Sequence, residues 1–579
     1  MLTSLAHMPQ NFSTKAVTVA AFLLFLSPSL QPLLINPNEA PWFTTPLFAF
    51  TAIVAYLITT FSKIRVNKFI ILPLGLGITP ILLHLFEASL TDSLFYISFI
   101  ITILGLWTLA TNASAKTSRK LLITYSVAAS IWCILAISVW AGFTHNDMIH
   151  IGKWALTTVV GIKINGPFSN GNVFGILVFC AWVISLWLWL KQKNSFGNFL
   201  FPTMVFFWAV GIASLSRGAW TAHTIVVAIV FFHLLLNNRK RLIPFIIAFS
   251  IALPLGSMLS SLGNAHPIKI TQQFETTQQE GFGARLLLWA STFEIWKQYP
   301  WQGVGYGQLG SHYLTGQHDA FEKYHFNMHG LKTTTYAHNT PLHLLAEGGV
   351  AGALTALFIC FSVILALILN WNRIHSVTWP ATMIAGMLWL QGMANISMTR
   401  PFPILLFSLA IGLSLRAFLR HRHNSYSIPK RYFVIPIVLS LLVLCSGAYA
   451  QTRAWDTYGE WLTLKNSTKG KQGLVRQLLS NDSTMPYIVG ETVRNVLLTP
   501  SQHHVAPQFM PYIITALNKL ETPLLYEGLF FTQALSGDMK GACKTGRFNM
   551  VQNWENDDNS NYYLAACEGR LSQFLEIQN

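Results

Sequence analysis

The chain alternates between long apolar segments and short polar connections. Thirteen segments are long enough to cross the roughly 30 Å hydrocarbon layer of a membrane as helices. They lie near 16–35, 43–61, 68–86, 94–111, 121–143, 172–190, 199–216, 219–236, 242–262, 346–370, 377–395, 401–418 and 432–450. The first has no small-residue cleavage site after it, so we interpret it as a span and not as a signal peptide. The pattern predicts an all-α fold, a polytopic transmembrane helical bundle.

Basic residues occupy every second connection between these segments. They are Lys63, Arg65 and Lys68, then Lys116, Arg119 and Lys120, then Lys191 and Lys193, then Arg239, Lys240 and Arg241, then Arg373, and last Arg416, Arg420, Arg422, Lys430 and Arg431. The short alternate connections hold only Lys153, Lys163, Arg217 and Arg400. Positive charge is retained on the cytoplasmic side, so the N-terminus and the basic loops are predicted to be cytoplasmic. An odd number of spans then places the C-terminal tail outside.

The composition agrees with a membrane protein. Hydrophobic residues make up 52% of the chain and charged residues 10%, whereas soluble domains carry roughly 25% charged residues. The net charge of +16 could suit nucleic acid. However, the basic residues fall in short runs between apolar segments, and no basic stripe interleaved with aromatic residues is present. We therefore exclude a nucleic-acid partner.

Four parts of the chain follow from these patterns. The sequence predicts an N-terminal transmembrane bundle at 1–262, a large outer loop at 263–345, a C-terminal transmembrane bundle at 346–450, and an outer α-helical domain at 451–579. The last part is polar and is interrupted by "NDS", "TPSQHH" and "ENDDNSN". It contains Cys543 and Cys567, which could form a disulfide outside the cell membrane. Sequence alone does not decide whether this disulfide forms, because it does not give the distance between the two cysteines.

Unusual polar residues gather on the predicted outer side. They are Asn170 and Asn172 in "GPFSNGNVFG", Arg217 in "SLSRGAW", Arg285 in "GFGARLLLWASTFEIW", His338, Asn339 and Glu347 in "TTYAHNTPLHLLAEGGVAG", and Arg400 in "SMTRPFP". Each has a structural alternative. An arginine can extend to lipid headgroups, and Asn339 can cap a helix that begins at Thr340. Glu347 lies near the start of that helix, where the helix dipole favours a negative charge. All of these residues are nevertheless predicted to lie on the same, outer side of the membrane, which suggests that they form one functional region.

The residue types suit chemistry on a phosphorylated lipid. Guanidinium groups bind phosphate oxygens in a planar, bidentate manner, and a histidine can remove a proton near neutral pH. A hydroxyl activated in this way could displace a diphosphate without a metal, a nucleotide or a covalent enzyme intermediate. Metal binding is a weaker alternative, because the histidines in or near the large loop form no "HExxH" motif; they are His266, His312, His318, His325, His329, His338 and His343. We interpret "GVGYGQLG" at 303–310 as a turn.

Three of these motifs occur in the order found in a known superfamily. "SLSRGAW", "RLLLWASTFEIWKQYPWQGVGYGQLG" and "AHNTPLHLLAEGGVAG" resemble the O-antigen ligase and O-oligosaccharyltransferase superfamily, over most of the polytopic core 1–450. The resemblance implies a GT-C-like enzyme of the bacterial inner membrane. It would transfer glycans from undecaprenyl diphosphate on the periplasmic face by a metal-independent, inverting displacement, with no cofactor. It further implies that Arg217 and Arg285 hold the diphosphate and that His338 activates the acceptor. Asn170, Asn172, Arg400, Asn339 and Glu347 are then possible donor or acceptor contacts.

The branch of the superfamily is less defined. The thirteenth span and the tail, with "RYFVIPIVLSLLVLCSGAYAQTRAWDTYGEWL", resemble the PglL-like pilin glycosylation ligases, whose acceptors are Ser or Thr of pilins and other periplasmic proteins. The chain has Asn170-Gly171-Asn172 where that branch tends to have Gln-Pro-Asn, and Arg400 where it tends to have Tyr. Ligation to lipid A core, polysaccharide polymerisation, and a non-enzymatic transporter or scaffold for lipid-linked glycans stay open as alternatives.

Overall fold

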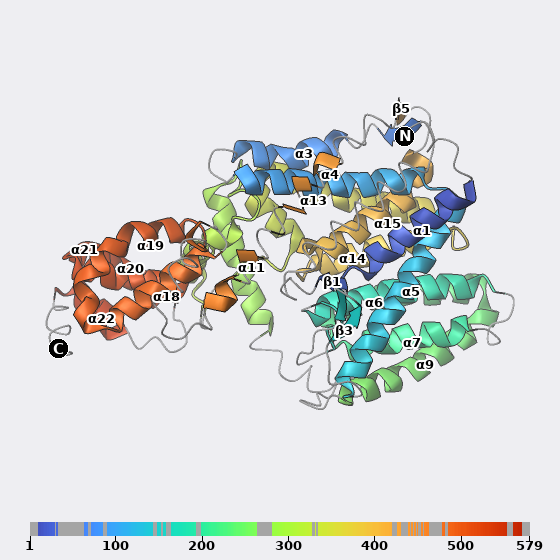
Figure 1. Ribbon diagram of the computed structural model, residues 1–579. Coiled ribbons are helices and arrows are strands. Elements are labelled where there is room, and N and C mark those ends of the chain that lie inside the picture. Colours follow the sequence, from blue (N-terminus) through green and yellow to red (C-terminus); the bar gives the residue numbers. More distant parts are fainter. Residues whose placement is uncertain are drawn as a thin grey trace. The chain divides into compact units, whose positions relative to one another are not determined.

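The computed structural model contains two compact units, each built from separated stretches of the chain (Figure 1). Unit 1 comprises residues 1–78, 89–277 and 354–449, and unit 2 comprises 79–88, 278–353 and 450–579. The structure describes residues 10–28, 30–32, 63–67, 71–84, 90–142, 148–151, 154–157, 164–168, 170–192, 199–262, 281–326, 330–331, 334–419, 425–429, 438–440, 442–443, 445–446, 449, 453–454, 457–461, 478–480, 484–552 and 560–569.

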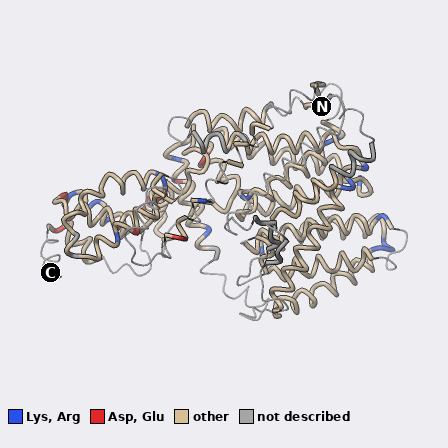
Figure 2. Tube along the Cα trace, in the orientation of Figure 1, with Lys and Arg blue, Asp and Glu red and all other residues tan. Residues whose placement is uncertain are grey.

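The expectation of a helical membrane protein is confirmed. Six described helices are long and apolar enough to cross a membrane: α5 (Ala115–Trp140), α6 (Gly171–Leu190), α8 (Arg217–Asn237), α9 (Arg239–Ser261), α13 (Thr340–Asn370) and α15 (Pro401–Leu419). Other helices coincide with further expected spans: α1 (Gln10–Leu26), α3 (Ile71–Leu83), α4 (Leu90–Asn112), α7 (Leu200–Ala213) and α14 (Thr378–Gly392). The expected span 43–61 lies outside the described residues, and 432–450 lies largely outside them. Charged positions are sparse along the helices of unit 1 (Figure 2).

Helix α6 forms the centre of unit 1. Its side chains are buried along almost the whole helix, including Phe179, Trp182 and Trp187. It packs against α5, α7, α8 and α14. Outside this group α7 packs on α9, α4 on α15, and α1 on α5. A helix that is apolar on all sides is expected at such a position, because neighbours cover every face of it.

Two small antiparallel sheets in unit 1 depart from the expected all-α fold. One has the strand order β1 (Leu30–Pro32), β4 (Trp154–Thr157), β3 (Met148–Ile151), and the other pairs β2 (Lys63–Asn67) with β5 (Ser425–Pro429). The first expected span was placed too far along the chain, because α1 ends at Leu26 before Pro28, which has no amide hydrogen for a helix bond. Each sheet joins connections that the charge pattern places on the same side of the membrane.

Unit 2 joins the outer loop to the C-terminal tail. From the loop come α11 (Gly281–Gln298), η3 (Leu309–Ser311) and α12 (Tyr313–Tyr324). The tail contributes α18 (Met485–Leu497), η6 (Pro500–Phe509), α19 (Met510–Leu517), α20 (Pro523–Leu535), α21 (Met539–Gln552) and α22 (Ser560–Cys567). Leu288, Tyr313 and Leu314 of the loop pack against Tyr526 and Phe548 of the tail. The two parts therefore share an apolar core.

Two buried polar side chains of the tail also bind the loop. Glu521 accepts hydrogen bonds from the amide of Thr315 at 2.9 Å and from its hydroxyl at 2.5 Å. Burial raises the pKa of Glu521, even though these bonds and one from the Tyr526 hydroxyl favour the charged form. Gln552 donates to the carbonyl of Leu314 at 2.7 Å and accepts from Gln317 at 2.5 Å. Removal of either tail side chain would therefore take hydrogen bonds away from the loop.

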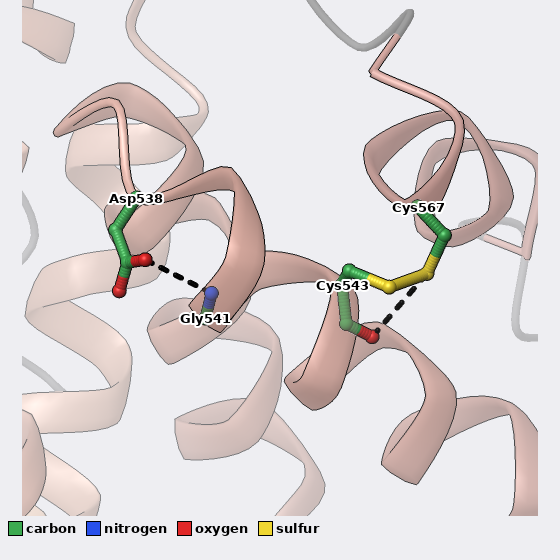
Figure 3. The surroundings of a disulfide bond; sticks show 4 residues. All are labelled: Asp538, Gly541, Cys543 and Cys567. Carbon is green, nitrogen blue, oxygen red and sulfur yellow. Dashed lines mark hydrogen bonds between the residues drawn. A yellow bond between two sulfur atoms is a disulfide. The ribbon is translucent and has the colours of Figure 1, made fainter.

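The disulfide that the sequence left open is present. Cys543 on α21 and Cys567 at the end of α22 are bonded, with their Cα atoms 4.6 Å apart (Figure 3). The start of α21 is fixed by Asp538, whose carboxylate accepts a hydrogen bond from the Gly541 amide at 2.9 Å (Figure 3). The bond closes a loop between residues 24 positions apart and thereby restrains α22.

Candidate active site

His338 lies in an unusual backbone conformation. Its φ angle is 51°, in the left-handed region, which few residues with a side chain adopt. It follows the fully buried Ala337 and precedes α13, and its own side chain is partly exposed. Only Leu215 and His325 share a positive φ among the non-glycine residues that the structure describes. Such conformations persist where surrounding structure holds them, often at functional sites.

Asn339 caps the helix that follows. Its side-chain oxygen accepts a hydrogen bond from the Leu342 amide at 3.0 Å, and its carbonyl accepts one from the His343 amide at 2.8 Å. This is the capping role that the sequence offered as the alternative to ligand contact. The cap fixes the first turn of α13 directly after His338.

Glu347 is buried and holds the glycine-rich loop. One carboxylate oxygen accepts a hydrogen bond from the Leu309 amide at 3.2 Å. The other lies 3.3 Å from Nε2 of His343. Burial and the nearby Glu347 charge together raise the pKa of the Tyr306 hydroxyl. These contacts give Glu347 a structural role inside unit 2, and contact with a donor or acceptor stays a prediction.

Helix α13 is broken at Gly349, where φ is 53° and ψ is −135°. The loop pairs with the backbone exposed by this break. Val304 donates to the Ala346 carbonyl at 3.0 Å, Gly305 donates to the Glu347 carbonyl at 2.9 Å, and Val350 donates to the Trp301 carbonyl at 3.1 Å. A Cβ atom added at Gly349 would lie 2.3 Å from the Trp301 oxygen, and one at Gly303 would lie 2.4 Å from the Glu347 oxygen. We term this paired segment, 301–305 with 346–350, the glycine joint.

The glycine joint belongs to the same small core as α11. Ile295 of α11, Val304, Leu309, Ala337 and Ala346 form one buried apolar cluster. Arg285 lies on α11 and is partly exposed. Unit 2 thus supports Arg285 and His338 on elements that pack against one another. The turn expected at 303–310 is present, but its pairing with α13 was not predicted.

Arg217 begins α8 in unit 1. Ser216 caps this helix, and its hydroxyl accepts a hydrogen bond from the Ala219 amide at 3.3 Å. The preceding Leu215 is buried and has a left-handed φ of 53°. Arg217 itself is partly exposed. A guanidinium at a helix N-terminus adds a charged donor to amides that already favour anions.

The starts of α6 and α8 meet the end of α14. Asn170 caps α6 by accepting a hydrogen bond from the Asn172 amide at 2.8 Å. The Asn172 carbonyl accepts a hydrogen bond from Gln391 at 2.6 Å. A Cβ atom at Gly218 would lie 3.5 Å from Nδ2 of Asn395. Arg400 follows η4 (Ser397–Thr399), and its amide donates to the Ser397 carbonyl at 3.2 Å.

Three buried polar atoms lie at this junction without a hydrogen-bond partner among the described residues. They are Oε1 of Gln391, Nδ2 of Asn395 and Oγ of Ser397. An unpaired buried polar group costs about 1–3 kcal/mol, so each requires an explanation. Sequence reasoning missed these residues, because they resemble ordinary polar residues at the end of an apolar segment. We term Gln391 at the end of α14, together with Asn395 and Ser397 that follow this helix, the α14 polar cluster.

The candidate residues therefore fall into two groups. Unit 1 brings together Asn170, Asn172, Arg217 and Arg400 around the α14 polar cluster. Unit 2 holds Arg285, His338, Asn339 and Glu347. Near the latter group, burial opposes ionisation of Glu294, but hydrogen bonds from Lys297, Tyr324 and Lys323 outweigh it and lower the pKa of this carboxyl. Within the described part of the chain, no group of three or more His, Cys, Asp or Glu residues is arranged to hold a metal ion.

Fold and site define a multi-pass helical membrane protein with arginine and histidine residues on its polar connections. A family model described as O-Antigen ligase matches residues 202–357. This segment includes Arg217, Arg285 and His338, and the match confirms the resemblance to the O-antigen ligase superfamily that the three motifs indicated. It also supports an enzyme rather than a scaffold. No curated protein matches the chain at a significant level.

Proposed function

We propose that this protein transfers a glycan from a lipid-linked diphosphate, undecaprenyl diphosphate, to a hydroxyl group of an acceptor. The observation that carries the proposal is the left-handed backbone of His338, held between the buried Ala337 and the capped start of α13. The matched family segment supports the same reaction class. A strained histidine on a rigid support is typical of a residue that must present its ring at a fixed place.

The reaction is a direct displacement. His338 takes the proton of the acceptor hydroxyl, and the acceptor oxygen forms a bond to the anomeric carbon of the donor sugar. The bond from that carbon to the diphosphate oxygen breaks, and the electron pair leaves with the diphosphate. Arg217 and Arg285 each bind diphosphate oxygens and stabilise the charge that develops there. Attack opposite the leaving group inverts the anomeric configuration.

The proposal includes thirteen spans with the site on the periplasmic face of the inner membrane. Hydrogen bonds in unit 1 support the alternation of sides, because each joins span ends that the charge pattern places together. At the outer ends, Trp140 donates to the Leu259 carbonyl at 3.1 Å. At the inner ends, Arg416 donates to the Ser118 hydroxyl at 3.0 Å. The β1–β4 and β2–β5 pairings follow the same rule.

The acceptor that we propose is Ser or Thr of pilins and other periplasmic proteins, as in the PglL-like branch. The tail supports this choice, since it forms one core with α12 of the outer loop. A soluble domain adds binding area that a polypeptide acceptor needs. The second candidate is ligation to lipid A core, which the description of the matched family favours.

Replacement of His338 tests the reaction. We expect His338→Ala to lower transfer by roughly 10²–10⁴-fold with little change in donor binding, because a general base acts mainly in the transition state. His325→Ala is the matched control, since His325 has nearly the same φ, 52°, in the same unit. Transfer is measured in detergent from a lipid-linked glycan, with and without EDTA. Equal, small effects of both substitutions would exclude His338 as the base, and loss of activity in EDTA with rescue by a divalent metal would contradict the metal-independent mechanism.

A further inference from the structure

The α14 polar cluster presents a defined set of hydrogen-bonding atoms. Nε2 of Gln391 donates to the Asn172 carbonyl at 2.6 Å, so its Oε1 is the atom left as an acceptor. The side-chain oxygen of Asn395 accepts from the Ile396 amide at 2.9 Å, so its Nδ2 is the atom left as a donor. Ser397 adds a hydroxyl that can do both. All three residues are buried.

This set does not suit an anion. A phosphate offers acceptors only, and the Gln391 oxygen would oppose it. A secondary amide offers one N–H donor and one carbonyl acceptor, which complement Oε1 of Gln391 and Nδ2 of Asn395. The hydroxyl of Ser397 can pair with a neighbouring hydroxyl of the same ligand. A sugar that carries an acylated amino group combines these features.

The cluster also has a fixed relation to Arg217. The residue after Arg217 is Gly218, where an added Cβ atom would lie 3.5 Å from Nδ2 of Asn395 and 3.6 Å from Cγ of Gln391. Both side chains thus border the backbone next to the arginine that we assign to the diphosphate. In a lipid-linked donor, the first sugar is bonded directly to the diphosphate. The group expected beside Arg217 is therefore that sugar.

From these contacts we infer that Gln391, Asn395 and Ser397 bind the acylated amino group of the donor sugar bonded to the diphosphate, and so select donors. The inference rests on the proposed function, in which Arg217 holds the diphosphate. A peptide bond of a protein acceptor has the same amide chemistry. We favour the sugar because Gly218 and Arg217 are adjacent in the chain.

The test uses two short-chain lipid diphosphate donors that differ only at C2 of the first sugar, one with an acetamido group and one with a hydroxyl. For the wild-type protein we expect kcat/KM to favour the acetamido donor by at least tenfold, since a site with buried polar groups discriminates against a ligand that leaves them unpaired. Asn395→Ala should reduce this preference to near one. Gly218→Ala should reduce it as well, because the added methyl occupies the space beside Asn395 while making only ordinary contacts.

Asn370→Ala provides the matched control. Asn370 is buried like Asn395, but its amide donates to the Ala366 carbonyl, the Thr382 hydroxyl and the Ser414 carbonyl. Its replacement should lower stability and leave the donor preference unchanged. Equal use of both donors by the wild type, or a preference that survives Asn395→Ala and Gly218→Ala, would overturn the inference, as would a change in acceptor KM alone. If the wild type transfers neither donor, the proposed function fails; binding of the two donors then decides the inference, and equal binding overturns it.

Discussion

At the scale of the residue, a left-handed backbone occurs at one proposed reaction residue, His338, and two residues before another, Arg217. Leu215 and His338 have left-handed φ angles of 53° and 51°. Leu215 ends the turn from which Ser216 and Arg217 start α8, and His338 ends the turn before α13. A left-handed conformation is costly for a residue with a side chain, so each of these turns must be held by the structure around it. Arg217 thus lies at the start of α8, and His338 lies two residues before the start of α13.

The two arginines should tolerate lysine poorly. Arg217→Lys and Arg285→Lys keep the charge but lose the planar, bidentate donor pair. Hydrogen bonds between charged groups contribute about 1.5–3 kcal/mol, so we expect transfer to fall roughly 10–100-fold for each, and further for alanine. Arg239→Lys is the control, since Arg239 donates to the Leu235 carbonyl near the predicted cytoplasmic side. Rates of transfer at saturating acceptor measure the effect. Wild-type rates in both lysine variants would contradict diphosphate binding by these side chains.

At the scale of the element, the glycine joint explains why two motifs far apart in sequence both contain glycine. The break at Gly349 exposes carbonyls that a regular helix would use, and residues 304 and 305 donate to them. The joint therefore connects the loop that follows α11 to α13 through backbone hydrogen bonds. His338 lies two residues before the same α13, so we expect its position to depend on the joint.

Gly349→Ala should disrupt this joint. The methyl group would lie 2.3 Å from the Trp301 oxygen at a φ of 53°. We expect a loss of about 2–4 kcal/mol in stability and a fall in transfer larger than the fall in folded protein. Gly386→Ala is the control, because no atom lies within 4 Å of its added Cβ and alanine is favoured in a helix by roughly 1 kcal/mol. Melting temperatures in detergent compare the two. Similar melting temperatures for both variants would show that the joint bears no strain.

The sequence predicts some of these elements and not others for physical reasons. Apolar length indicates where most of the membrane helices lie, since the backbone groups of a membrane helix bond within the segment, but it did not predict that α1 ends at Leu26. The Asn339 cap depends only on residues three positions away, so the sequence could predict it. The β2–β5 pair and the glycine joint depend on partners far along the chain, so no local pattern marks them. The sequence did not predict a role for Gln391 and Asn395, because only the structure shows that each has a buried polar atom without a hydrogen-bond partner in the part of the chain that it describes.

At the scale of the whole molecule, the tail is part of the unit that carries His338. Glu521 accepts hydrogen bonds from Thr315 of α12, and Gln552 donates to the Leu314 carbonyl of the same helix. Removal of 451–579 would leave these groups unpaired and expose the core shared by Leu288, Tyr313 and Tyr526. Such a deletion would impair every activity and could not separate acceptor docking from folding. Surface substitutions are the better probe.

Tyr512 and Ile514 of α19 meet this need, since their side chains are 53% and 49% exposed. If the tail docks a polypeptide acceptor, a Tyr512→Ser, Ile514→Ser double variant should lower transfer to a pilin by about tenfold, because aromatic and apolar anchors dominate such interfaces. Thr515→Ala on the same helix should have no effect. The variants are expressed in a host that lacks its own ligases and makes a lipid-linked glycan, with either a pilin or only lipid A core supplied. Mass increments on Ser or Thr of the pilin report protein transfer. Glycan on lipid A core alone would assign the chain to ligation, and longer glycans on the donor lipid would assign it to polymerisation.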